Sequence, residues 1–154
     1  MPYHIAQINI GRLIAPVDDP RIAEFVAQLD PINALADAAP GFVWRLQSAS
    51  GNATDIAYSA DPRMAVNMSV WESLEALRGF VYKAEHLRVL RDRVRWFEKM
   101  DKAHGCLWWV NAGHLPTVDE GRERLTHYQE HGPTAHAFWF TQCFPAPAES
   151  VGLG

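Results

Sequence analysis

The side chains best suited to catalysis or ligand binding lie between residues 82 and 100. If this segment is helical, at about 100° per residue, Tyr82, His86 and Arg93 share one face of the helix. The same face carries the apolar residues Val89, Leu90, Trp96, Phe97 and Met100. A face of this kind is expected to pack on a sheet, where an unpaired polar group costs about 1 to 3 kcal/mol. The phenol, the imidazole and the guanidinium therefore need partners.

Two interpretations of these three residues stay open. In the first, Arg93 bonds a buried carboxylate or strand carbonyls, and His86 bonds Tyr82 or a backbone group. In the second, all three line a pocket between helix and sheet. His86 is then a general base or a metal ligand, and Arg93 holds an anionic substrate group or an oxyanion. The second interpretation makes Tyr82, His86 and Arg93 the predicted catalytic residues.

Polar residues that interrupt apolar strands are candidates for substrate binding. They would supply fixed donors and acceptors on a rigid floor if the strand register brings them to one face. Strand-edge hydrogen bonds or a dimer interface would explain them equally well. The candidates are Asn9, Arg45 or Gln47, Asn67 or Ser69, and Asn111. Trp71, Trp96 and Trp109 extend this set, because indoles suit a flat hydrophobic ligand, although they suit an aromatic core as well.

The remaining histidines give weaker signals. His127 and His131 are spaced i, i+4 and could share a metal ion. They also lie in the last turn before Gly132, where the helix dipole by itself favours histidine. His104-x-Cys106 lacks the two further ligands of a zinc site, so no metal is expected unless His86 binds haem.

The cysteines and short motifs exclude several classes of enzyme. Cys106 has no adjacent triad signature, and Cys106 and Cys143 have no C-x-x-C spacing, so neither a thiol nucleophile nor a redox motif is indicated. No G-x-S-x-G, P-loop or G-x-G-x-x-G string occurs. The usual motifs for α/β-hydrolase, phosphoryl-transfer and dinucleotide chemistry are therefore missing.

Composition bounds the class of protein. The chain has 154 residues, 48% of them hydrophobic and 21% charged, which suits one globular domain. Fourteen basic and eighteen acidic residues give a net charge of −4, and nucleic-acid binding is not expected at that balance. No apolar run approaches the roughly 18 residues of a membrane span. We therefore expect a cytoplasmic protein that binds neither nucleic acid nor membranes.

The apolar periodicity predicts the order of the elements. Strands are expected at residues 3–10, 42–47, 66–71, 106–111 and 137–143, with a turn near 50–52, and a short strand at 56–58 stays open. Helices are expected from Asp19-Pro20 to Pro40-Gly41 with a second start signal at Asp30-Pro31, and from 117 to 132. A long helical region is expected from about 73 to 102, in which a break near 83–85 stays open. Residues 1–144 form one predicted domain, and 145–154 a flexible tail.

This order predicts an α+β fold. Its first six elements are those of the ferredoxin-like pattern, an antiparallel sheet with helices on one face. Residues 106–111 carry bulky apolar side chains on both faces of their strand, so the second face also needs cover. A sheet from a twofold-related copy is the economical cover. The sequence therefore predicts a homodimer of the dimeric α/β-barrel type.

Several short sequence motifs follow one another along nearly the whole chain, from about residue 3 to residue 144. They are Gly41-Phe-Val-Trp-Arg45, Ser69-Val-Trp-Glu-Ser73, His86 with Arg93-x-x-Trp96-Phe97, Leu107-Trp-Trp-Val110 with Gly113-His114-x-Pro116-Thr117, and Gly132-Pro-Thr134. Together they resemble the mostly bacterial family called domain of unknown function 3291. The resemblance implies a fold similar to the dimeric α/β barrels, which include antibiotic-biosynthesis monooxygenases, polyketide cyclases and haem proteins.

The resemblance implies a set of hypotheses about function, because fold alone does not decide activity. The first is an enzyme that acts on a flat, largely apolar metabolite by oxygenation, cyclisation or isomerisation, without a tightly bound organic cofactor. The second is a haem-binding protein with His86 as axial ligand and Arg93 as propionate partner. The third is a protein that binds a small ligand without converting it.

Overall fold

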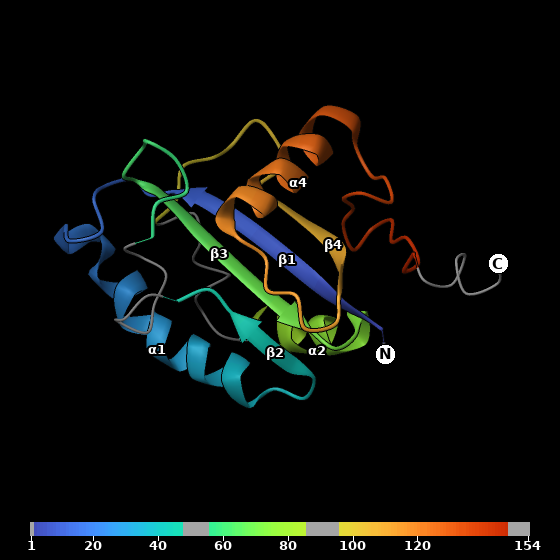
Figure 1. The fold of residues 1–154 in the computed structure, drawn as a ribbon. Helices are drawn as coiled ribbons and strands as arrows, with labels where there is room; N and C mark the ends of the chain where they lie inside the picture. Colours follow the sequence, from blue (N-terminus) through green and yellow to red (C-terminus); the bar gives the residue numbers. More distant parts are fainter. Residues whose placement is uncertain (1, 48–55, 86–95, 148–154) are drawn as a thin grey trace.

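The computed structural model describes residues 2–47, 56–85 and 96–147 (Figure 1). Its elements are β1 (Tyr3–Arg12), the 3-10 helix η1 (Pro20–Ile22), α1 (Ala23–Ala38), β2 (Phe42–Arg45), β3 (Met64–Trp71), α2 (Leu74–Glu85), β4 (Gly105–Asn111) and α4 (Val118–His131). The strands form one antiparallel sheet in the order β2-β3-β1-β4. This is the ferredoxin-like arrangement, so the predicted α+β fold is confirmed.

Side-chain caps explain where two helical segments begin. The Asp19 and Thr117 side chains each accept a hydrogen bond from a backbone N–H of the following turn, at 2.8 and 3.1 Å. The second start signal, Asp30-Pro31, does not divide α1, which runs through it. Pro31 and Ala27, whose carbonyl loses its helical partner, are both exposed, so water can take the place of that bond.

The long helix expected from residue 73 to residue 102 is wrong at its C-terminal end. α2 is described as far as Glu85, and residues 86–95 lie outside the described part of the chain. Residues 96–100 are not helical. Phe97 instead forms an antiparallel bridge with Leu13, and the Trp96 carbonyl accepts the Ile14 N–H at 2.9 Å. Tertiary pairing with the end of β1 overrides the local helical pattern.

The strand predicted at 137–143 and the one left open at 56–58 are both absent as regular elements from the described residues. Residues 137–143 make a single antiparallel bridge to β4, in which the Leu107 and Phe138 backbones exchange two hydrogen bonds of 2.7 and 2.9 Å. Residues 56–58 are irregular. The turn expected near residues 50–52 and the tail from residue 148 onward lie outside the described residues.

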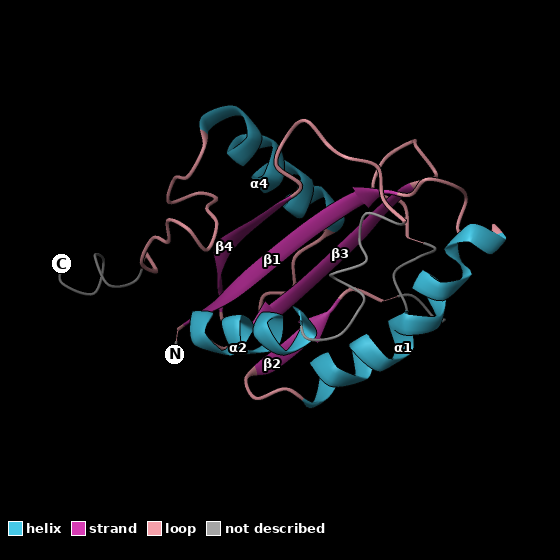
Figure 2. Ribbon diagram, turned by 180° about the vertical axis from the view of Figure 1, so that it is seen from behind, coloured by secondary structure: helices cyan, strands magenta, loops and turns pink. Residues whose placement is uncertain are grey.

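Helices cover the sheet on both faces, which differs from the expected arrangement with helices on one face. α1 and α2 lie on the face seen in Figure 2, and α4 crosses the opposite face, which is in front in Figure 1. Because side chains alternate along a strand, Gln7 and Asn9 of β1 point toward α1 and α2, whereas Ile8 and Ile10 point toward α4. No helix among the described residues is long and apolar enough to cross a membrane.

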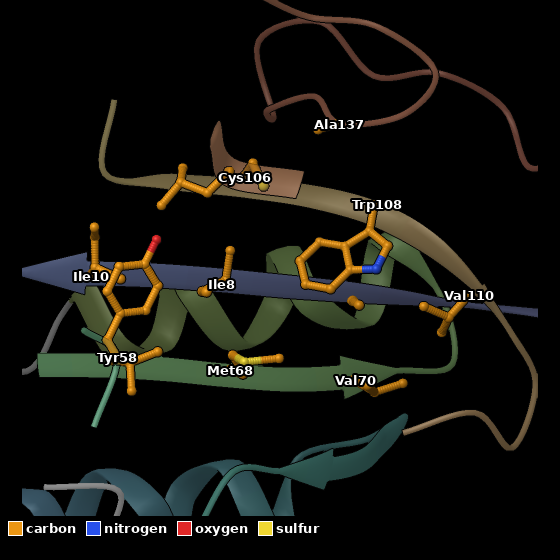
Figure 3. Packing of buried hydrophobic residues seen from close by; sticks show 12 residues of the cluster. Ile8, Ile10, Tyr58, Met68, Val70, Cys106, Trp108, Val110 and Ala137 are labelled. Carbon is orange, nitrogen blue, oxygen red and sulfur yellow. The ribbon is translucent and has the colours of Figure 1, made fainter. Parts of the chain in front are cut away.

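The core under α4 is closed by this chain alone. Ile8, Met68 and Trp108 of three adjacent strands have no exposed surface and belong to one cluster (Figure 3). Leu125 of α4 packs in the same cluster. α4 thus provides the cover that the sequence assigned to a second copy. The premise behind the homodimer therefore does not hold, and the homodimer itself stays a prediction.

The close approach of α4 to the sheet can be tested at Gly121. A Cβ there would lie 2.8 Å from Ile8 Cδ1 and 3.2 Å from Met68 Cε and Sδ. We expect Gly121→Val to lower the free energy of unfolding in urea by about 1 to 3 kcal/mol, because it overpacks this contact. Gly79→Ala in α2 is the control. No atom lies within 4 Å of its Cβ position, so better helix propensity should raise stability by about 0.5 to 1 kcal/mol. A Gly121→Val protein as stable as wild type would contradict the packing.

Candidate functional site

A pocket lies between the sheet and the helices α1 and α2. Its volume is about 420 Å³, inside the range of roughly 300 to 1,000 Å³ that is usual for small-molecule sites. Its walls are mostly apolar and come from α1, α2 and the segment after α4. They include Phe25, Leu29 and Ile32, then Leu77, Phe80 and Val81, and finally Trp139 and Phe140. The pocket is therefore built for a largely apolar molecule.

Four polar side chains of β1 and β3 form the floor of this pocket. The register sets Gln7 opposite Ser69. It also sets Asn9 opposite Asn67. Gln7 Nε2 donates to Asn67 Oδ1 at 2.7 Å and to Ser69 Oγ at 2.8 Å. Asn9 Nδ2 donates to Gln7 Oε1 at 3.0 Å and to Asn67 Oδ1 at 3.2 Å. The Trp71 indole N–H adds a bond of 2.8 Å to Ser69 Oγ. This network fixes the floor on rigid strands.

The Asn67 amide is arranged to donate a hydrogen bond into the pocket. Its Oδ1 atom already accepts from Gln7 and Asn9. Its Nδ2 group makes no hydrogen bond to the residues that the structure describes, and the side chain is exposed where it lines the pocket. An oxygen atom of a bound molecule would satisfy this donor.

The part of the pocket lining that the structure describes carries little net charge. The described residues that line it include no carboxylate. Arg45 is only 11% exposed, and Asp37 neutralises its guanidinium through bonds of 2.8 and 3.3 Å. A charged ligand would have to be desolvated there without an obvious counter-ion, which is costly. The lining therefore favours an uncharged ligand.

One imidazole, that of His104, belongs to the described lining of the pocket. His104 directly precedes β4, and its backbone carbonyl accepts the Ile10 N–H at 2.8 Å. This hydrogen bond fixes the backbone of His104 beside Ile10, and Asn9 is the residue that precedes Ile10 in β1. His104 is exposed to solvent.

The predicted substrate-binding residues divide into two groups. Asn9, Arg45, Asn67 and Trp71 line the pocket. Trp96, Trp109 and Asn111 do not.

Each of the residues that do not line the pocket has a structural place elsewhere. Trp96 is 1% exposed and its ring centroid lies 5.8 Å from that of Phe25, so it is a core residue. The Trp109 indole donates to the Phe144 carbonyl at 2.8 Å. Asn111 is exposed at the end of β4.

The predicted catalytic residues are not brought together by the described part of the chain. Tyr82 is 66% exposed and does not line the pocket, so the expectation that it faces the sheet is wrong. The face of α2 that meets the sheet carries Leu77 and Ala84 instead. His86 and Arg93 lie outside the described residues, and their roles stay predictions.

Four polar residues of the described pocket lining are not among the predicted site residues: Gln7, Ser69, Asn33 and His104. A signal for the first two exists in the sequence, because Gln7-x-Asn9 and Asn67-x-Ser69 both have the spacing of two that places polar groups on one face of a strand. The sequence indicates Ser69 only as an alternative to Asn67. His104 carries no comparable signal, since its place depends on how β4 pairs with β1.

Haem finds little support in the described lining. Its one histidine, His104, is exposed to solvent, and its one guanidinium, Arg45, is already paired with Asp37. Neither arrangement is that of an axial ligand with a propionate partner. The haem hypothesis therefore depends entirely on His86 and Arg93, and we derive no step through haem.

Two further polar residues, Cys106 and His114, do not line the pocket. Cys106 has no exposed surface and points to the α4 side of the sheet, together with Ile8 (Figure 3). Burial raises the pKa of its thiol to about 12. His114 bonds Glu120 at 2.6 Å, and the same carboxylate accepts the Trp108 indole N–H at 3.0 Å. Cys106 and His114 therefore have structural roles.

Comparison with known proteins places this α+β architecture in a family. The chain belongs to the family described as Domain of unknown function (DUF3291), which it matches over residues 4–152. Among curated proteins, none matches it.

Several solved structures have a similar fold. SnoaB, a cofactor-independent oxygenase from Streptomyces nogalater, is 16% identical with a TM-score of 0.45, over 73% of this chain and 95% of that one. The monooxygenase from the gene ActVA-Orf6 of Streptomyces coelicolor, solved in complex with nanaomycin D, is 16% identical with a TM-score of 0.42, over 74% and 92%. MupZ from Pseudomonas fluorescens is 11% identical with a TM-score of 0.45, over 96% and 98%. At this level the likeness concerns the fold alone.

The burial of Cys106 predicts the reactivity of the two thiols. With a pKa of about 12, only about one Cys106 in 10⁴ is a thiolate at pH 8. A disulfide reagent at pH 8 should therefore modify Cys143, which is half-buried, and leave Cys106 intact until denaturant is added. The Cys143→Ser variant is the control and should not react when native. Rapid reaction of this native variant would contradict the assignment of Cys106 as a core residue.

Proposed function

We propose that this protein is an enzyme that converts a flat, largely apolar, uncharged small molecule in the pocket between the sheet and α1 and α2. The reaction we propose is an oxygenation, cyclisation or isomerisation that needs no tightly bound organic cofactor. The observation that carries the proposal is the pocket itself, with apolar walls over a floor of cross-linked amides. Sites of this composition are typical of small-molecule recognition.

The floor supports a definite mode of binding. The ligand lays its apolar surface against the aromatic side chains of the walls, including Phe80 and Trp139. A carbonyl or hydroxyl oxygen at one edge of the ligand accepts a hydrogen bond from Asn67 Nδ2. The network through Gln7 and Asn9 holds this amide in place before the ligand arrives, which lowers the entropic cost of binding.

The same arrangement supports proton transfer. Removal of a proton next to a carbonyl group leaves negative charge on the carbonyl oxygen, and a preorganised donor stabilises that charge. Asn67 Nδ2 is placed to be this donor. His104 is the base that we propose from the described lining, whereas His86 is the base expected from the sequence alone. The alternative function is binding without conversion, in which the imidazole only orients the ligand.

The binding mode predicts the effect of replacing Asn67. Tryptophan fluorescence, with Trp71 in the pocket as reporter, can follow titration with a naphthoquinone, a flat molecule with carbonyl oxygens at its edge. Asn67→Leu should weaken binding about two- to tenfold, which corresponds to one lost hydrogen bond. Asn111→Leu is the matched control, because Asn111 lies outside the pocket, and should bind like wild type. Equal affinity in all three proteins would overturn the binding mode.

Catalysis is tested separately with His104. A metabolite extract is incubated with the protein, and native mass spectrometry then shows whether a captured compound is recovered unchanged or converted. If a compound is converted, His104→Ala should lower kcat by about 10² or more, as expected for loss of a general base. His114→Ala, which removes an imidazole outside the pocket, should keep wild-type turnover, and His86→Ala tests the sequence-based candidate. Recovery of an unchanged ligand alone would favour the noncatalytic alternative.

A further inference from the structure

We propose that Glu123, His127 and His136 form a binding site for a divalent transition-metal ion of the zinc type. One ligand atom from each of these residues lies within 4.8 Å of the other two. Two imidazoles and a carboxylate are a common zinc-binding set, and a fourth position can be filled by water. This site is independent of the pocket, because it lies on the outer side of α4.

The fold brings these residues together in two ways. Glu123 and His127 are one helical turn apart on α4, so their side chains share one face of the helix. His136 comes from the segment that turns back after the helix ends at Gly132, where φ is +72°. The His127 and His136 ring centroids are 4.6 Å apart. His131 extends the same helix face, with its ring centroid 4.4 Å from that of His127.

A proton now occupies the place that the metal ion would take. The guanidinium of Arg124 can only donate, and its Nη1 atom lies 3.0 Å from His136 Nδ1. Nδ1 is therefore the acceptor, and the ring proton is on Nε2, which lies 2.7 Å from Glu123 Oε1. On metal binding, Nε2 gives up this proton and becomes a ligand together with the carboxylate, and the neutral ring carries a proton on Nδ1 instead. Because two donors cannot share a hydrogen bond, the Nη1 group of Arg124 then moves away from Nδ1. Arg124 keeps its 2.9 Å bond to the His136 carbonyl oxygen.

Metal ions bind the neutral form of an imidazole. Glu123 supplies one negative charge. Glu130 follows His127 by three residues, about one turn of α4. A site with nitrogen and carboxylate ligands should prefer zinc, nickel or copper to magnesium or calcium.

A bound ion would have a structural consequence. It would join α4 to the segment just before Phe138, whose backbone pairs with Leu107 of β4. The ion would thus reduce the freedom of this segment in the folded chain, and a ligand that binds only the folded state raises its stability.

The experiment is a titration of the tag-free full chain with Zn²⁺ by calorimetry and with Co²⁺ by visible absorbance. We expect one ion per chain, a cobalt spectrum of tetrahedral type, and a rise in Tm with Zn²⁺. His127→Ala and His136→Ala should each weaken zinc binding at least about tenfold. Even mutation of a residue that only hydrogen-bonds to a metal ligand lowers metal affinity by about that factor. Glu123→Gln, which preserves the size of the side chain, should weaken it as well.

His114→Ala is the matched control for this titration, because His114 also pairs with a glutamate of α4 but has no third ligand in the described residues. Its zinc affinity should equal that of wild type. Near-ultraviolet circular dichroism in metal-free buffer identifies the variants that keep the native fold. The proposal is overturned if wild type binds zinc no more tightly than the double variant of His127→Ala and His136→Ala, or if His114→Ala weakens binding to the same extent.

Discussion

The alternation of side chains along β1 is the constraint on which the rest of this structure depends. β1 is central in the sheet and is hydrogen-bonded to β3 on one side and to β4 on the other. Its odd-numbered residues Gln7 and Asn9 face α1 and α2, and its even-numbered residues Ile8 and Ile10 face α4. A shift of one residue in register would bury the amides under α4 and expose the isoleucines. The pocket floor and the apolar core are therefore specified by the same pairing.

The order of the elements could be predicted because each one carries a local signal. Helical and strand periodicities, together with the caps at Asp19 and Thr117, are properties of neighbouring residues in the sequence. The errors occur where a distant segment decides the local structure. Residues 96–100 have apolar spacing that suits a helix, but they pair with the end of β1 instead. The aromatic residues from 137 onward favour a strand, yet only Phe138 reaches β4 in a ladder geometry.

The candidate site could be predicted only in part for the same reason. That polar residues in β1 and β3 form a floor was foreseeable for Asn9 and Asn67, because each interrupts an apolar strand. The register places Asn9 opposite Asn67 and Gln7 opposite Ser69. A single sequence does not reveal this register. Indoles carry no such information: Trp71 lines the pocket, whereas Trp96 fills the core, although both are large aromatic residues in apolar surroundings.

The position of α4 bears on how fast two copies of this chain could associate through the sheet. The face that carries Ile8 and Met68 is occupied by Leu125 of the same chain, so a second copy has no direct access to it. Such association would require α4 to leave its place or to be exchanged between copies, as in domain swapping. The rate of association would then be limited by local unfolding of the single chain. Above a low protein concentration, this rate would no longer increase with concentration.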